Sequence, residues 1–161
     1  MAGFKKGIKS GYYKPANPEK WIITESFDMK KGKPGIKYRS SWEHMFFKFM
    51  DFNDNITKCN SEGMVIPYQN PVTGKMSKYY MDAMMETKNG KIWLIEIKPR
   101  AQRFPPKPPR SNAKDPEKAN KNYVKAIETY AINQAKWKAT EILCEEKGWE
   151  FIIIDETHLF K

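Results

Sequence analysis

A short predicted strand carries a carboxylate and an ammonium group on one face. Over residues 92–98 the side chains of Glu96 and Lys98 share a face with Ile92 and Leu94, because successive residues of a strand point to opposite sides. Glu96 and Lys98 are then about 7 Å apart along the strand. Interior charges are costly unless they are paired or bind a metal ion. This pair is therefore a candidate for binding or catalysis.

Two more carboxylates, Asp82 on the preceding predicted strand and Glu43 on a predicted helix, can join them. Hard cations such as Mg²⁺ take oxygen ligands, few from protein and the rest from water and phosphate. Two or three carboxylates can therefore hold Mg²⁺ beside a lysine that orients water or stabilises charge on phosphorus. A structural role is the alternative for each: Glu43 in a helix cap, Glu96 and Lys98 as an edge ion pair, Asp82 at a strand end.

The helix that carries Glu43 is predicted over residues 41–52. Ser40 and Glu43 have the spacing of a capping box at its start. Apolar residues at helical spacing predict one buried stripe, with Glu43 on its rim. The stripe consists of Trp42, Met45, Phe46, Phe49 and Met50.

Strands are predicted over residues 63–68, 78–85, 91–98 and 149–155. A long helical pattern begins at Asp115-Pro116 and ends at Gly148, and we expect fraying or a break near residues 120–122. This order predicts an α/β (α+β) domain in which a mixed sheet of about four strands is flanked by helices.

The proposed chemistry fixes the register of the hairpin at Asn89-Gly90. A two-residue turn would place Asp82 opposite Ile97, on the other face from Glu96. A three-residue loop with Gly90 at positive φ places Asp82 directly across from Glu96, with Cβ atoms about 5 Å apart. We therefore predict the longer loop or an equivalent bulge.

The 161 residues suit a single domain and carry a net charge of +10. Residues 1–41 carry +7, residues 42–98 are neutral, and residues 99–122 carry +5. A neutral centre between basic margins favours a nucleic-acid partner, although basic segments can also serve solubility alone. We expect a flexible arm over 1–20 and one domain over 21–161, with a basic, proline-rich loop over 99–115.

Several classes of protein are excluded by composition. Two cysteines outside any CxxC and two histidines cannot form a zinc finger or a His-metal nuclease site; we expect two buried thiols. No apolar run approaches the roughly 20 residues of a membrane span, and the N-terminus lacks the apolar stretch of a signal peptide. We therefore expect neither a membrane protein nor one exported by that route.

The spacing Asp82…Glu96-Ile97-Lys98 resembles the D…(D/E)xK signature of the PD-(D/E)XK nuclease superfamily, and Glu43 matches its helix glutamate. The chain is also similar, from Tyr13 to Leu159, to the head completion nucleases of T-even-type tailed phages. More distantly it resembles the TnsA-type transposon endonucleases. The motifs that carry the closer likeness are Tyr38–Glu43, Ser61-Glu62, Ile66–Tyr68, Glu96–Pro99 and Asn133-x-x-Lys136-Trp137. Met81 departs from the pattern, since proline commonly precedes the aspartate.

The resemblance implies a restriction-endonuclease-like fold and a Mg²⁺-dependent nuclease, with Mn²⁺ expected to substitute. The nuclease would act on double-stranded DNA before head–tail joining, in the host cytoplasm and in contact with head or neck proteins. Asp82, Glu96 and the carbonyl of Ile97 would hold the metal. Glu43 would complete the site and Lys98 would position water. Glu62, Asn133, Gln134 and Lys136 are left without an assigned role.

Two other functions share these residues. One is a catalytically silent DNA-binding or portal-binding protein of head completion, which would have no need of an intact charge set. The other is a transposase-type or junction-resolving subunit, which would normally dimerise; we see no dimer signal and expect a monomer. In each case the loop over 99–114 is expected to clamp DNA through its basic residues Arg100, Arg103, Lys107, Arg110 and Lys114.

Overall fold

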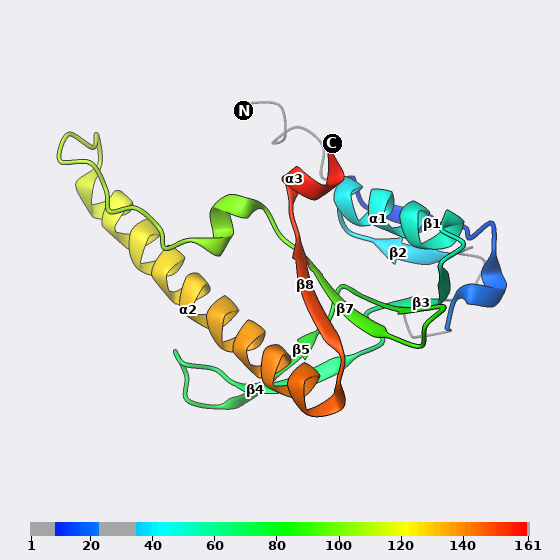
Figure 1. Cartoon of the computed structure of the whole chain (residues 1–161). Helices are drawn as coiled ribbons and strands as arrows, with labels where there is room; N and C mark the ends of the chain where they lie inside the picture. The colour runs from blue at the N-terminus through cyan, green and yellow to red at the C-terminus, as the bar shows by residue number, and fades with distance from the viewer. Residues whose placement is uncertain (1–8, 23–34, 161) are drawn as a thin grey trace.

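The computed structural model describes residues 9–22 and 35–160. Its centre is a four-stranded mixed sheet in the strand order β3-β6-β7-β8 (Figure 1). The β3–β6 and β6–β7 pairs are antiparallel, whereas β8 runs parallel to β7. One apolar core joins this sheet to α1 on one face, and a second joins it to α2 on the other. The predicted mixed sheet of about four strands flanked by helices is confirmed.

The elements have the following bounds. The central sheet contains β3 (Ile56–Ser61), β6 (Ala83–Thr87), β7 (Ile92–Ile97) and β8 (Glu150–Ile154). Two small sheets pair β1 (Gly11–Tyr13) with β2 (Ile36–Tyr38) and β4 (Val65–Gln69) with β5 (Met76–Tyr80). The helices are α1 (Ser41–Phe52), α2 (Pro116–Lys147) and α3 (Glu156–Leu159), with 3₁₀ turns η2 (Pro18–Lys20) and η3 (Arg100–Arg103). None of the described helices is long and apolar enough to cross a membrane.

The β6–β7 hairpin has the register that the site requires. Ala83 pairs with Ile95 and Glu86 with Ile92, and Thr87 accepts a hydrogen bond from the amide of Gly90 at 2.8 Å. Gly90 has φ of 79°, which is the left-handed conformation that glycine adopts at low cost. The predicted three-residue loop is therefore confirmed.

The strand predicted over residues 78–85 is two strands in two sheets. β5 pairs with β4, whereas β6 pairs with β3 and β7. The chain passes from one sheet to the other at Met81 and Asp82. Met81 is fully buried, and its amide donates to the carbonyl of Met64 at 2.9 Å. A proline at this position could not make that bond, which explains the departure from the superfamily pattern.

Helix α1 begins where it was predicted, but its buried face is different. Ser40 caps it by accepting from the amide of Glu43 at 3.1 Å. The Glu43 carboxylate, however, accepts from Arg39 and not from Ser40, so the capping box is incomplete. Met45 and Phe49 of the predicted stripe are exposed, because the sheet covers the neighbouring positions. The buried residues are Phe46, Phe47, Met50 and Asp51.

Helix α2 is continuous over its full 32 residues, so the expected break near residues 120–122 is wrong. Asp115 caps its start by accepting from the amide of Lys118 at 3.1 Å. Gly148 ends it in the left-handed conformation, with φ of 69°. Both predicted ends are therefore confirmed.

Two segments have more structure than the sequence predicted. Strand β3 was not predicted, since a bulge between Ile56 and Lys58 breaks its alternation of buried and exposed residues. Within the expected flexible arm, β1 and η2 are tied to α1 by the buried Asp51. This carboxylate accepts from the hydroxyl of Tyr13, the amides of Ala16 and Asn17, and the indole of Trp21. Residues 1–8 of the arm lie outside the described residues.

Candidate active site

Asp82 and Glu96 face each other at one end of the central sheet. The pairing of Ala83 with Ile95, extended by one residue, sets Asp82 opposite Glu96. Asp82 Oδ2 accepts from the amide of Ile97 at 2.7 Å. In a strand the N–H and C=O of one residue point toward the same neighbour, so the carbonyl of Ile97 also faces the Asp82 side. The sequence-predicted ligands Asp82, Glu96 and Ile97 are thus brought together.

Two groups hold the carboxylate of Glu96, whose side chain is 6% exposed. Lys98 Nζ lies 3.3 Å from Glu96 Oε1, and the hydroxyl of Tyr79 donates to Glu96 Oε2. Tyr79 is buried on β5, and burial together with the charge of Glu96 raises its pKa. The phenol therefore stays protonated and donates to the carboxylate.

The sequence did not indicate Tyr79. On one continuous strand it would point away from Asp82, because the two positions differ by an odd number. The passage between the sheets at Met81 turns it to the same side. Lys136 of α2 lies over its ring, 5.3 Å from the centroid, and 5.8 Å from the ring centroid of Tyr68. Lys136 therefore packs against Tyr79, which supports Glu96, and against its neighbour Tyr68.

Glu43 approaches the pair from the first turn of α1. Its Oε2 accepts from the amide of Arg39 at 2.6 Å. Burial raises the pKa of Glu43, the Arg39 amide opposes that rise, and the charges of Glu62 and Glu96 add to it. Glu43 thus lies within electrostatic reach of Glu96.

Glu62 and Arg39 form an ion pair beside the carboxylates. Glu62 follows β3 with φ of 53°, and it is the one described residue other than glycine with a positive φ. Its amide lies 3.4 Å from the carbonyl of Asp82. The pKa of Arg39 is raised by its hydrogen bond to Glu62, and the charges of Glu43 and Asp82 add to this. Arg39 thus contacts Glu43 through its amide and Glu62 through its guanidinium group, a role that its motif alone did not reveal.

The electrostatics of the site fit a divalent cation. The pKa of Asp82 is raised to about 8, first by burial and then by the charge of Glu96, with Glu43 adding to the rise and the Ile97 amide opposing it. Glu96 is buried and Asp82 is half-buried, and two facing carboxylates in such a place resist ionisation together unless a cation neutralises them. The described residues contain no group of three His, Cys, Asp or Glu side chains arranged as a metal cage. The available donors are two carboxylates and a carbonyl, a set that suits a partly hydrated Mg²⁺.

Other predicted positions lie elsewhere. Gln134 is exposed on α2, so it is neither a core residue nor part of the carboxylate site. Its neighbour Asn133 is buried. Arg103 donates to the buried Asp155 at 3.0 Å, so it anchors the start of the proline-rich loop. The segment also contains η3, although no regular structure was predicted there. Cys59 and Cys144 are buried free thiols, as predicted.

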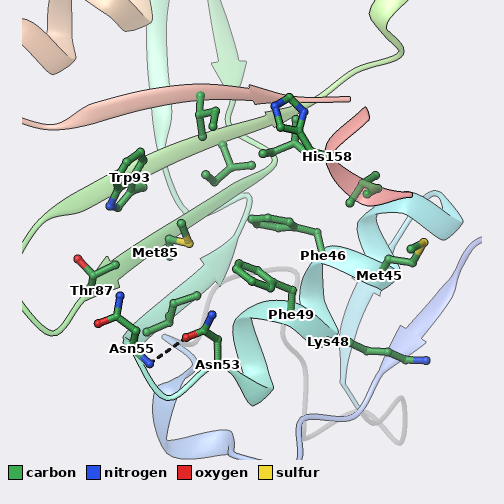
Figure 2. Close-up of a pocket in the computed structure, with 15 residues that line it drawn as sticks. Met45, Phe46, Lys48, Phe49, Asn53, Asn55, Met85, Thr87, Trp93 and His158 are labelled. Atoms are coloured by element: carbon green, nitrogen blue, oxygen red, sulfur yellow. Dashed lines mark hydrogen bonds between the residues drawn. The ribbon is translucent and has the colours of Figure 1, made fainter. Parts of the chain in front are cut away.

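A cavity of about 690 Å³ is separate from the carboxylates. It lies between α1 and the central sheet, where Phe46 and Phe49 approach Met85 and Trp93 (Figure 2). No aspartate or glutamate lines it. The cavity is therefore an apolar groove on the α1 face and not the site of the predicted chemistry.

A mixed sheet that presents facing carboxylates and a lysine at one end defines a nuclease of the restriction-endonuclease-like class. The chain belongs to the family described as "TnsA-like endonuclease N terminal", whose model matches residues 53–156. It is 38% identical over 141 residues to the head completion nuclease of Enterobacteria phage T4, a match that covers 87% of this chain and 91% of that protein. The resemblance inferred from the motifs is therefore confirmed.

Proposed function

We propose that the protein is a Mg²⁺-dependent deoxyribonuclease of the PD-(D/E)XK type that hydrolyses phosphodiester bonds in double-stranded DNA during phage head completion. The observation that carries the proposal is the Asp82–Glu96 pair with Lys98 bound to Glu96. A protein without turnover would gain nothing from facing carboxylates that raise the pKa of Asp82. The relative named a head completion nuclease supports the biological setting.

Asp82, Glu96 and the carbonyl of Ile97 would hold the cation, and Glu43 would act from the α1 side. The bound cation would act as a Lewis acid on the scissile phosphate. The Lys98 ammonium, 3.3 Å from Glu96, orients the attacking water and stabilises the negative charge that grows on the phosphoryl oxygens. Water adds to phosphorus as one phosphorus–oxygen bond breaks, which leaves a phosphate and a hydroxyl at the new ends.

The test is incubation of the protein with closed-circular and linear double-stranded DNA, in Mg²⁺ or in EDTA. We expect cleavage in Mg²⁺ and none in EDTA, with Mn²⁺ able to replace Mg²⁺. Cleavage of the closed circle would establish an endonuclease, whereas loss of linear DNA alone would establish an exonuclease. Intact DNA of both forms in both metals would refute the proposal.

Cleavage in the host cytoplasm during assembly would bring the protein into contact with head or neck proteins. The basic segments suit DNA, because lysine and arginine contacts to phosphate need no particular base. We therefore propose a nuclease with little sequence preference that works as a monomer on the filled head. Cleavage patterns on unrelated DNA sequences measure that preference.

Tyr79→Phe is expected to lower kcat between about tenfold and about a hundredfold, while KM for DNA changes little. The loss of one hydrogen bond to a charged group is worth about 1.5–3 kcal/mol, and here that bond orients Glu96. Single-turnover kinetics measures the change. Tyr68→Phe is the matched control, since Tyr68 shares the contact with Lys136 but has no described bond to Glu96. Equal effects of the two variants would mean that Tyr79 only fills space.

A further inference from the structure

The proline-rich segment and the first half of α2 form an arm, residues 104–132, that extends beyond the domain. No residue of α2 before Asn133 is buried, and Figure 1 shows this half of the helix leaving the sheet. Seventeen residues, Pro116–Ile132, correspond to about 25 Å of helix. This half of α2 contributes little to the domain core, so core packing does not explain why the helix is so long.

The proline-rich segment lies antiparallel to the first half of α2 and stiffens the arm. Half-buried side chains recur every third residue, at Pro106 and Pro109, which is the period of an extended proline-rich chain. Phe104 and Pro106 line a small cavity together with Ala126 and Tyr130 of α2. Figure 1 shows the chain following α2 outward before it returns as the helix. The prolines keep this path rigid, since they have little backbone entropy to lose.

The charge of the arm lies on the proline-rich side. Residues 104–114 contain three basic residues and no acidic residue, whereas residues 115–132 contain three of each. Lys107, Arg110 and Lys114 are exposed, and none of them has an ion pair within the described chain. A rigid row of free cations matches a regular polyanion better than it matches a protein surface of mixed charge.

The base of the arm is fixed relative to the carboxylates. Pro99 follows Lys98 directly, and the amide of Arg100 donates to Glu156 at 2.9 Å. Arg103 donates to Asp155 at 3.0 Å. Burial of Asp155 favours a raised pKa, but hydrogen bonds from Thr157 and Arg103 lower that pKa to about 2. Asp155 is therefore ionised at neutral pH, where it pairs with the positive charge of Arg103.

We infer that the arm binds the backbone of duplex DNA to one side of the cleaved bond, through Lys107, Arg110 and Lys114. The inference rests on the proposed nuclease function. An arm of about 25 Å spans about seven nucleotides at 3.4 Å each. Arg103, which the sequence grouped with these cations, belongs to the anchor instead. The arm extends the length of DNA held without adding base recognition.

The test compares a triple variant, K107A/R110A/K114A, with a matched control, K48A/K58A/K88A, whose lysines are equally exposed on α1, β3 and the β6–β7 loop. Both are made in the Asp82→Asn background, so that DNA is bound but not cut. Fluorescence anisotropy measures Kd for duplexes of increasing length and at several salt concentrations. For the arm variant, the negative slope of log K against log salt should be shallower by between two and three, because each lost phosphate contact removes about 0.9 from it.

The affinity of the arm variant should also stop increasing with duplex length about seven base pairs earlier than that of the control. In the active background, the same substitutions should lower kcat/KM on long duplexes and leave short duplexes unchanged. An unchanged slope and length dependence in a protein that still cleaves DNA would overturn the inference. The arm, with Val124 and Ile127 exposed, would then be a protein-docking surface. If the unmodified protein does not cleave DNA at all, that result would instead overturn the proposed nuclease function itself.

Discussion

Asp82→Ala, Glu96→Ala and Lys98→Ala are each expected to lower the rate of Mg²⁺-dependent DNA cleavage at least about a thousandfold. Metal-assisted stabilisation of a transition state is worth several kcal/mol, and each 1.36 kcal/mol is a factor of ten in rate. Asp82 and Glu96 would lose a cation ligand, and Lys98 would lose the ammonium group that faces Glu96 Oε1 at 3.3 Å. Single-turnover cleavage of a labelled duplex measures the effect.

Glu86→Ala is the matched control, because Glu86 is a carboxylate near the far end of β6, the strand that Asp82 immediately precedes. Its cleavage rate should stay within about twofold of the unmodified protein, since a surface substitution away from the site changes little. Circular dichroism must show folded protein for all four variants. Unaltered turnover in Glu96→Ala would refute the assignment of the site. Glu43→Ala should reduce activity as much or slightly less.

In EDTA, the protein is expected to lose stability between pH 5.5 and pH 8.5 because of Asp82. Its folded pKa of about 8 lies above the ordinary value of 3.8. A raised folded pKa means that the protonated carboxyl contributes stability below about pH 4, and that this contribution is lost as the pH rises toward 8. Each unit of pKa displacement is worth about 1.4 kcal/mol, or about 3 °C in Tm for a chain of this size.

Asp82→Asn separates this effect from other titrating groups. The variant should keep a flatter Tm profile in EDTA, and at pH 8.5 it should melt at a higher temperature than the unmodified protein. Adding Mg²⁺ at pH 8.5 should raise the Tm of the unmodified protein, because a ligand that binds only the folded state stabilises it, and should have little effect on the variant. Parallel Tm profiles of the two proteins in EDTA would show that Asp82 ionises normally.

The features that local spacing controls were predictable from the sequence. The requirement that Asp82 and Glu96 share a face determined the hairpin register, since a shift of one residue exchanges the faces of a strand. Asp115 and Gly148 marked the ends of α2, because caps depend on neighbouring backbone groups. The alternation of β7 was predictable as well: Ile92 and Leu94 pack on the α2 side of the sheet, whereas Ile95 packs on the α1 side.

The features that depend on distant contacts were not predictable. Seven of the twelve residues of α1 are Trp, Met or Phe, so periodicity alone could not show which side the sheet covers. The passage at Met81 depends on a bond to Met64, which no local pattern signals. The support of Glu96 by Tyr79 follows from that passage. The bond between Arg39 and Glu62 joins residues 23 positions apart, and only the folded chain brings them together.

The passage between sheets at Met81 has a consequence for motion. Tyr79 belongs to the β4–β5 hairpin, which packs on α2 through Ile66, Tyr68 and Trp137, whereas Glu96 and Lys98 belong to the central sheet. Local opening of one packed unit needs less free energy than global unfolding. If the hairpin undocks from α2, Glu96 loses the hydrogen bond from the Tyr79 hydroxyl while the central sheet stays folded. Glu96 therefore keeps its orientation only while the hairpin stays docked on α2. On heating, the protein should lose nuclease activity at a lower temperature than the one at which the central sheet unfolds.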